Sequence, residues 1–185
     1  MVRKRARKMV HVLDDVPAPT LQGPADAEVT LIGWGSTWGV LAEAVERLNR
    51  EGLSTNHLQI KFLVPFHAAE VGALLRGSRR IVVVENNHSG QFARHLRAET
   101  GIAAHGHIRK FDGEPFEPKH IVGAVREIVE TGKNVVDVLS TEPAGGRNIR
   151  RGRAETGRGD TSRRPAFRDT AWRSEPWQTH LQCSR

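Results

Sequence analysis

Between residues 29 and 131 the chain alternates short apolar runs with longer segments of helical periodicity. The run Val29–Ile32 opens this stretch, and Arg80–Glu85 is a continuous β-branched run, typical of a strand that is buried on both faces. Strands separated by helices require crossover connections, which make neighbouring strands parallel. We therefore predict an α/β protein, a three-layer α/β/α sandwich with a mostly parallel sheet and residues 80–85 as its innermost strand.

Apolar spacing and helix-ending glycines give the remaining expected elements. Period-2 alternation predicts a strand over 57–63, closed by Pro65, and a weaker strand over 103–110 that contains Gly106. Gly52 and Gly101 follow two of the helical patterns, where a glycine suits the helix end. The expected helices span 38–50, 68–76, 91–100 and 117–131.

The first strand leads into the glycine-rich turn Gly33-Trp34-Gly35-Ser36-Thr37. We expect Gly33 and Gly35 to supply positive φ and Ser36 and Thr37 to cap the following helix. One interpretation is an anion cradle at the helix N-terminus, and the other is an ordinary strand–helix connection. The ordinary connection is favoured, because the third glycine and the acidic ribose partner of a dinucleotide site are missing.

A second polar segment, Glu85-Asn86-Asn87-His88-Ser89-Gly90-Gln91, follows the buried strand. It falls at the carboxyl edge of the sheet, where ligands of open α/β sheets bind. Glu85 can serve as an acid or base, or as a hydrogen-bond acceptor across a subunit contact. Helix capping by Asn87 and Ser89 is favoured over catalysis, because one carboxylate among amides defines no reaction.

The histidines give no clear metal site. His105 and His107 alternate on a predicted strand and so share a face, but zinc requires three or four ligands and none falls at matching spacing. A solvated or hydrogen-bonded role is favoured for both. We predict no metal site and assign no catalytic residue.

Most of the net charge of +7 belongs to the C-terminal segment. Residues 141–185 contain 10 Arg, no Lys and 5 acidic residues, and the rest is nearly balanced. This composition favours a disordered tail over a nucleic-acid site, although phosphate neutralisation and stacking on Trp172 and Trp177 are conceivable. The chain has one cysteine, Cys183, and no apolar run near the roughly 18 residues that a membrane span requires. Both features indicate a cytoplasmic protein.

Four segments follow one another along the chain: Ile32–Thr37, Leu63–Phe66, Val83–Asn87 with Gly90 and Gln91, and Lys110–Phe116. In this order and at these intervals they resemble the C-terminal domain of the α subunit of 2-oxoacid:ferredoxin oxidoreductases, and most closely that of the 2-oxoglutarate enzymes. The resemblance covers roughly residues 3–130 and includes the basic opening Lys4–Lys8. It implies a transketolase C-terminal-like fold.

The resemblance implies oxidative decarboxylation of a 2-oxoacid such as 2-oxoglutarate or pyruvate, with transfer to coenzyme A and electrons passing to ferredoxin. In the complete complex, thiamine diphosphate, magnesium and an iron–sulfur cluster are expected, together with a β subunit. This chain alone is not expected to bind them. It has one cysteine where a cluster normally takes four, and it lacks the Gly-Asp-Gly motif of the cofactor domain.

We therefore expect an N-terminal linker over 1–26, the α/β domain over 27–138 and an Arg-rich disordered tail over 139–185, in a truncated α subunit that is not catalytic alone. A shifted reading frame is one hypothesis for the tail. The alternatives are a free-standing interaction or anion-binding module, and a domain of another thiamine-dependent enzyme such as a dehydrogenase E1 β chain. The expected loop and subunit-contact residues are Gly33, Trp34, Gly35, Ser36, Thr37, Glu85, Asn86, Asn87, Gly90 and Gln91.

Overall fold

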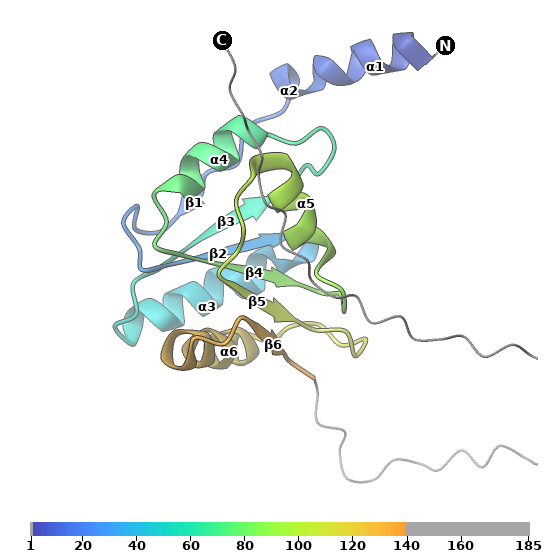
Figure 1. The fold of residues 1–185 in the computed structure, drawn as a ribbon. Coiled ribbons are helices and arrows are strands. Elements are labelled where there is room, and N and C mark those ends of the chain that lie inside the picture. The colour runs from blue at the N-terminus through green and yellow to red at the C-terminus, as the bar shows by residue number, and fades with distance from the viewer. Residues whose placement is uncertain (1, 140–185) are drawn as a thin grey trace, which may run out of the picture. The chain divides into compact units, whose positions relative to one another are not determined.

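The described residues form a six-stranded, mostly parallel sheet with helices on both faces (Figure 1). A computed structural model gives the structure and describes residues 2–139. The elements are α1 (Val2–Val10), α2 (Val12–Asp15), β1 (Leu21–Gln22), β2 (Val29–Trp34), the 3₁₀ turn η1 (Gly35–Thr37), α3 (Trp38–Arg50), β3 (Thr55–Ile60), α4 (Ala68–Arg76), β4 (Arg80–Glu85), α5 (Gln91–Thr100), β5 (Gly106–Arg109), α6 (Pro118–Thr131) and β6 (Val135–Asp137).

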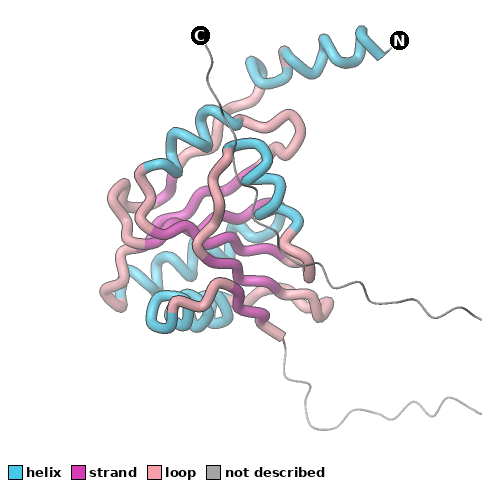
Figure 2. The backbone as a smooth tube through the Cα atoms, viewed as in Figure 1, coloured by secondary structure: helices cyan, strands magenta, loops and turns pink. Residues whose placement is uncertain are grey.

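The strands lie in the order β1-β3-β2-β4-β5-β6, so β2 and β4 are central. Of these strands, β1 alone runs antiparallel to its neighbour, with Leu21 opposite Leu58. Figures 1 and 2 show α4 and α5 over one face of the sheet and α3 and α6 over the other. The predicted three-layer α/β/α sandwich with a mostly parallel sheet is confirmed.

Each face of the sheet carries its own apolar core. Leu31 and Val82 point to the side of α3 and α6, whereas Ile32 and Val83 point to the side of α4 and α5. All four side chains are fully buried. Successive strand residues face opposite layers, so a central strand must be apolar at every position, which explains the continuous run in β4.

The helices predicted over 38–50, 68–76 and 91–100 are confirmed, and the last helix starts at Pro118, one residue later than predicted. Glu117 and His120 close a capping box at its start. The strand predicted over 103–110 is shorter, at 106–109. His105 lies just before it and accepts a hydrogen bond on Nδ1 from the Ile81 N–H at 2.9 Å, so its hydrogen-bonded role is confirmed.

The strand predicted over 57–63 is wrong at both ends, because β3 spans Thr55–Ile60. Its first residue is polar but buried, held by a pair of 2.8 Å hydrogen bonds between the Thr55 backbone and the Asn49 amide. After the strand, the Leu63 carbonyl bonds to His95 of α5 at 2.9 Å instead of to the sheet. The apolar alternation through Leu63 therefore reflects packing of a loop against α5.

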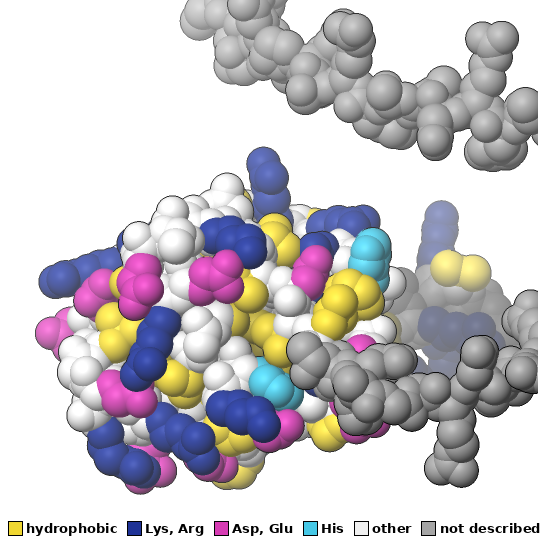
Figure 3. Space-filling view, turned by 90° about the horizontal axis from the view of Figure 1, so that it is seen from below, with side chains coloured by type: hydrophobic (Ala, Val, Ile, Leu, Met, Phe, Trp, Pro, Cys, Tyr) yellow, Lys and Arg dark blue, Asp and Glu magenta, His cyan; other side chains and the backbone are white. Residues whose placement is uncertain are grey.

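Within the expected linker over 1–26, the structure has two helices, α1 and α2, and the edge strand β1. The expected tail, with Trp172, Trp177 and Cys183, lies outside the described residues apart from Leu139. Among residues 2–139, no helix has the length and apolarity to cross a membrane. In Figure 3, the underside of the domain shows basic and acidic side chains interspersed, in agreement with the near-balanced charge before residue 141.

Candidate functional site

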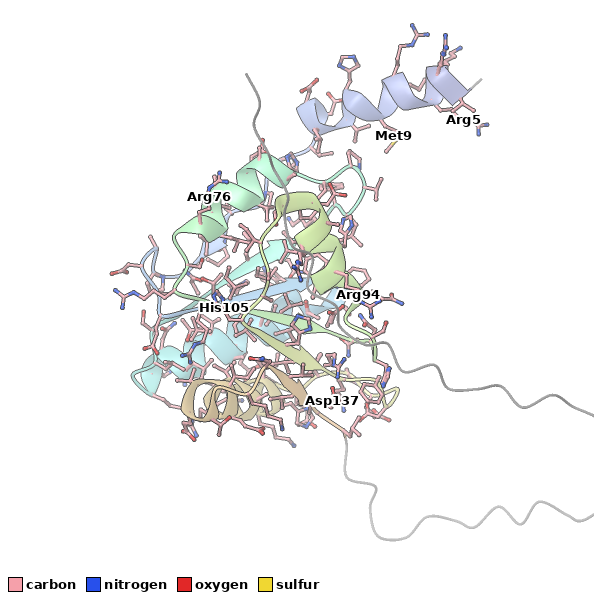
Figure 4. All side chains as sticks on the ribbon, viewed as in Figure 1. Arg5, Met9, Arg76, Arg94, His105 and Asp137 are labelled. Carbon is pink, nitrogen blue, oxygen red and sulfur yellow. The ribbon has the colours of Figure 1, made fainter. Side chains whose placement is uncertain are left out.

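The carboxyl ends of β2, β4 and β5 bring three polar loops to one edge of the sheet, which we call the rim: residues 33–37, 85–91 and 110–116. A hollow of about 560 Å³ lies between them, lined by Ser36 and Thr37, by Asn86, and by the third loop from Lys110 to Phe116. The labelled side chains of Arg94 and Asp137 in Figure 4 lie on this side, toward which the strand arrows of Figure 1 point.

In the first loop, the two glycines serve different purposes. Gly35 has φ of +62°, as predicted. Gly33 has no positive φ, so our expectation for this residue is wrong. A glycine is needed there because the Thr37 and Leu41 side chains lie close to its backbone. A Cβ there would lie 2.3 Å from the Thr37 hydroxyl and 2.4 Å from Leu41 Cδ1, far inside normal contact. The turn is therefore packed directly against the first turn of α3.

The expected cap of α3 is absent from this loop. The Thr37 hydroxyl donates to the Trp34 carbonyl at 3.0 Å, and no side chain caps the helix. Gly35 in turn accepts a 3.0 Å hydrogen bond from the Gln59 amide of β3. The prediction of side-chain capping by Ser36 and Thr37 is wrong, because Thr37 closes the turn on itself.

Glu85 is fully buried at the end of β4 and joins the sheet to α5. Its carboxylate accepts hydrogen bonds from the backbone N–H of Phe92 at 2.8 Å, from that of Ala93 at 3.4 Å, and from the Asn87 amide at 2.5 Å. A carboxylate is favourable at a helix N-terminus, where free N–H groups and the helix dipole attract it. Glu85 therefore acts as an internal anchor for α5.

The Asn87 side chain holds the rest of the second loop by hydrogen bonds. Its side-chain oxygen accepts hydrogen bonds from the N–H of Gly90 at 2.7 Å and of Gln91 at 3.2 Å, which confirms the predicted role of Asn87 at the start of α5. Gly90 occupies the N-cap position itself, so the predicted capping by Ser89 is wrong. Gly90 has φ of +67° and is buried next to His107. The Arg94 guanidinium closes the loop by donating to the Ser89 carbonyl.

The third loop holds a buried cation that the sequence analysis did not single out. Lys110 is 1% exposed, and its ammonium lies 2.5 Å from the Asp112 carboxylate. Its backbone N–H donates to the Glu85 carbonyl at 3.2 Å, which ties the second and third loops together. Lys110 and Asp112 are two residues apart directly after a strand, and this spacing of opposite charges is the feature of the sequence that could have indicated the ion pair.

Arg109 fixes the outer side of the rim. Its guanidinium contacts both carboxylate oxygens of Asp137, at 2.8 and 3.2 Å, and donates to the His88 carbonyl at 2.7 Å. The His88 ring in turn meets Phe111 edge to face, with centroids 4.8 Å apart. A two-point arginine–carboxylate contact is geometrically specific, so β6 and the second loop are held in a defined relation.

Burial is the main reason that the pKa of His107 lies below its usual range, and the nearby Arg109 cation lowers it further. The Glu85 carboxylate acts in the opposite direction. The His107 ring is thus mainly uncharged at neutral pH.

Apolar side chains are exposed beside these polar loops. Trp38 follows the first loop and is 57% exposed, and Phe111 in the third loop is 39% exposed. Phe62 and Val64, after β3, are 37% and 75% exposed. Among the exposed large apolar residues described, those outside the terminal segments all follow the carboxyl ends of strands. Such a grouping marks an interaction surface more often than scattered exposure does.

The predicted contact residues fall into three groups. Ser36, Thr37 and Asn86 line the rim hollow. Trp34 and Gln91 line a smaller hollow of about 220 Å³ beside Val64 and Phe92. The remaining residues, Gly33, Gly35, Glu85, Asn87 and Gly90, shape the loops, and Gly35 also borders a hollow with Trp38 and Gln59.

The donor groups present do not fit two of the cofactors that the resemblance implies, the iron–sulfur cluster and the magnesium ion. One cysteine, Cys183, cannot supply the four thiolates of an iron–sulfur cluster. Among residues 2–139, no three His, Cys, Asp or Glu side chains converge to hold a metal ion such as the magnesium of a pyrophosphate site. Of the acidic groups at or beside the rim, Glu85 bonds to α5, Asp112 pairs with Lys110 and Asp137 pairs with Arg109, whereas Glu114 is exposed and lines the rim hollow.

The order of the parallel strands, with helices on both faces and loops meeting at the carboxyl edge, defines a transketolase-type α/β domain. A split-gene transketolase structure, an inactive β4 tetramer, shares the fold at 17% identity and a TM-score of 0.50, over 63% of this chain and 42% of that one. Residues 27–121 match the family described as pyruvate:ferredoxin oxidoreductase core domain II, half of the chain, and the chain belongs to this family.

Similar proteins are α subunits of 2-oxoacid:ferredoxin oxidoreductases, which confirms the resemblance. The chain is 36% identical over 141 residues to subunit α of 2-oxoacid:ferredoxin oxidoreductase 2 of Aeropyrum pernix, covering 75% of this chain and 22% of the relative. It is 35% identical over 155 residues to the 2-oxoglutarate oxidoreductase subunit KorA of Mycobacterium tuberculosis, covering 78% of this chain and 23% of the relative.

Among solved structures, 2-oxoglutarate:ferredoxin oxidoreductase of Magnetococcus marinus, with 2-oxoglutarate, coenzyme A and succinyl-CoA bound, matches at 37% identity and a TM-score of 0.62. The match covers 69% of this chain and 22% of that one. The chain therefore spans about a fifth of the length of these relatives.

Proposed function

We propose that this chain is the core domain II part of the α subunit of a cytoplasmic 2-oxoacid:ferredoxin oxidoreductase, in which it makes subunit contacts and does no chemistry itself. The complete complex would decarboxylate a 2-oxoacid with thiamine diphosphate and magnesium, form an acyl-CoA and pass electrons through an iron–sulfur cluster to ferredoxin. The relatives named above support this assignment.

The observation that carries the contact role is the exposure of two apolar side chains, Phe111 in the rim and Val64 beside it, which are 39% and 75% exposed. An exposed apolar group of this kind gains free energy when another protein covers it. Glu85, Arg109 and Lys110 already have partners within the domain, which leaves contact as the better-supported use of the surface.

Assembly tests the proposal. The chain is mixed with a β subunit and with an α subunit from which core domain II has been deleted, and the complex is measured by size-exclusion chromatography with light scattering. We expect a stoichiometric complex that restores 2-oxoglutarate- or pyruvate-dependent reduction of ferredoxin. A chain that remains a monomer beside both partners would instead indicate a free-standing module.

A matched pair of variants locates the contact. Phe111→Glu places a charge on the rim, whereas Ala98→Glu places the same charge on the exposed surface of α5. We expect Phe111→Glu to weaken assembly at least tenfold and Ala98→Glu to leave it unchanged. Equal behaviour of the two variants would contradict a contact at the rim.

A further inference from the structure

A separate crevice of about 260 Å³ lies beside the end of β3, between that strand and residues 17–20. It exists because the edge strand is short, since β1 pairs with β3 only through Leu21 and Gln22. Pro17 and Pro19 come just before β1, and proline has no N–H with which to extend the ladder. The chain therefore leaves the edge of β3, and we call the resulting space the proline crevice.

Aromatic side chains form much of its wall. Trp38 and Phe62 line the crevice and are 57% and 37% exposed, whereas Phe66 and Ile60 line it from the core and are 7% and 2% exposed. Exposed flat rings beside an apolar floor offer stacking surfaces for a planar ligand.

Two buried polar side chains also line the crevice. Gln59 is 8% exposed, and because its amide nitrogen donates to the Gly35 carbonyl, its oxygen is left as an acceptor with no partner among the described residues. His67 is 6% exposed, and neither of its ring nitrogens has a hydrogen-bond partner within the described part of the chain. Its Nδ1 lies 3.7 Å from the Glu70 carboxylate. A buried acceptor without a donor is unfavourable until a ligand supplies one.

Charge adds a third requirement on the ligand. Of the described residues that line the crevice, Lys61 alone carries a full charge, and its side chain is exposed. An anionic substituent on a ring bound in the crevice would meet this ammonium in solvent, where the attraction is modest and weakens with salt.

We propose that the proline crevice binds a planar nitrogen heterocycle that carries an N–H donor and an anionic substituent, as in a purine mononucleotide. The ring stacks on Trp38 and Phe62, its N–H donates to Gln59 Oε1, and the anionic group pairs with Lys61. The volume of about 260 Å³ is below the ~300–1,000 Å³ typical of ligand pockets, which suits one base better than a dinucleotide. The rim hollow described above plays no part in this site.

Calorimetric titration of the full chain with adenosine 5′-monophosphate, purine riboside 5′-monophosphate, adenosine and ribose 5-phosphate tests the proposal. We expect the adenosine monophosphate to bind most tightly. Purine riboside monophosphate, which lacks the amino N–H, and adenosine, which lacks the phosphate, should each bind several-fold more weakly. Ribose 5-phosphate, which lacks the ring, should show no binding at the same concentration.

Variants with matched controls then place the ligand. Trp38→Ala should weaken binding of adenosine monophosphate by about tenfold or more, as loss of a stacking partner does, while Phe111→Ala changes nothing. Lys61→Ala should reduce the affinity for the monophosphate to that for adenosine, with Lys119→Ala as the control. All four side chains are exposed, so circular dichroism and thermal unfolding should match the parent chain.

Three results would overturn the proposal. They are no binding of adenosine monophosphate at millimolar concentration, equal binding of ribose 5-phosphate, and unchanged affinity in Trp38→Ala. The first two need no variant, so they decide the matter even if a substituted chain fails to fold. The titration uses no partner subunit, and its outcome is therefore separate from that of the assembly experiment.

Discussion

Glu85 offers the sharpest test of how this domain is held together. Its buried carboxylate is the acceptor for two backbone N–H groups at the start of α5, those of Phe92 and Ala93, and for the Asn87 side chain. Glu85→Leu replaces the carboxylate by an apolar side chain of similar size and leaves both N–H groups buried without an acceptor. Asn87 is half-buried and can turn toward water, so the two backbone groups dominate the cost.

The magnitude follows from these contacts. An unsatisfied buried donor costs roughly 1–3 kcal/mol, so two such donors sum to about 2–6 kcal/mol. Glu85→Gln keeps one carbonyl oxygen for the 2.8 Å bond to Phe92 and sacrifices the longer bond to Ala93, so its cost should be smaller, about 1–2 kcal/mol. For a domain stable by roughly 5–15 kcal/mol, the leucine variant is a severe change.

Urea unfolding at pH 7, followed by circular dichroism, measures both variants. With m near 1–3 kcal/mol/M, we expect the midpoint of Glu85→Leu to fall by about 1 M or more, and faster amide exchange at Phe92. Glu130→Leu makes the same change at an exposed position of α6 and should stay within about 0.5 kcal/mol. If Glu85→Leu matched that control, the anchoring role of the carboxylate would be refuted.

Three further predictions concern stability and pH. Gly33→Ala should cost about 1–3 kcal/mol in urea unfolding, because its Cβ meets Thr37 and Leu41, whereas Gly39→Ala, with open space around it, should be neutral or slightly stabilising. Burial lowers the pKa of His57 below 6.5, so the unfolded chain binds more protons than the folded chain. The free energy of unfolding should therefore fall as the pH drops through about 6.5 toward the lowered pKa, and His57→Leu should flatten this dependence. Asp137→Asn should loosen the two-point contact with Arg109 and speed amide exchange in β6, with little effect at β3.

The sheet and its helices were predictable because their burial pattern is simple. The run in β4 is apolar on both faces, and the helices of 9 to 13 residues at 38–50, 68–76 and 91–100 show one apolar stripe each, so their bounds were predicted correctly. The error at β3 arose because a polar residue is buried in this strand while an apolar residue lies outside it. Thr55 is buried, but Asn49 satisfies its backbone groups; Leu63 is apolar but lies in a loop, where its carbonyl bonds to His95 of α5.

The rim was predictable in location but not in its contacts. Strand ends followed by polar residues indicated the first two loops, and the capping role of Asn87 followed from its residue type. Arg109 and Asp137 are 28 residues apart in the sequence, and their pairing depends on two strands that become neighbours only in the sheet. Nothing local in the sequence marks such a pair, since its geometry is set by the register of β5 and β6.

The rim combines two kinds of residue that should respond to mutation in opposite ways. Glu85 and Arg109 are committed to internal partners, so their substitution should lower the free energy of unfolding while assembly with the partner subunits, measured below the unfolding midpoint, stays intact. Phe111 and, beside the rim, Val64 are exposed, so Phe111→Glu and Val64→Glu should leave unfolding nearly unchanged and weaken assembly. Chromatography and urea unfolding on the same four variants separate the two effects. If loss of assembly followed loss of stability across all four, the rim would be a folding element and the contact surface would lie elsewhere.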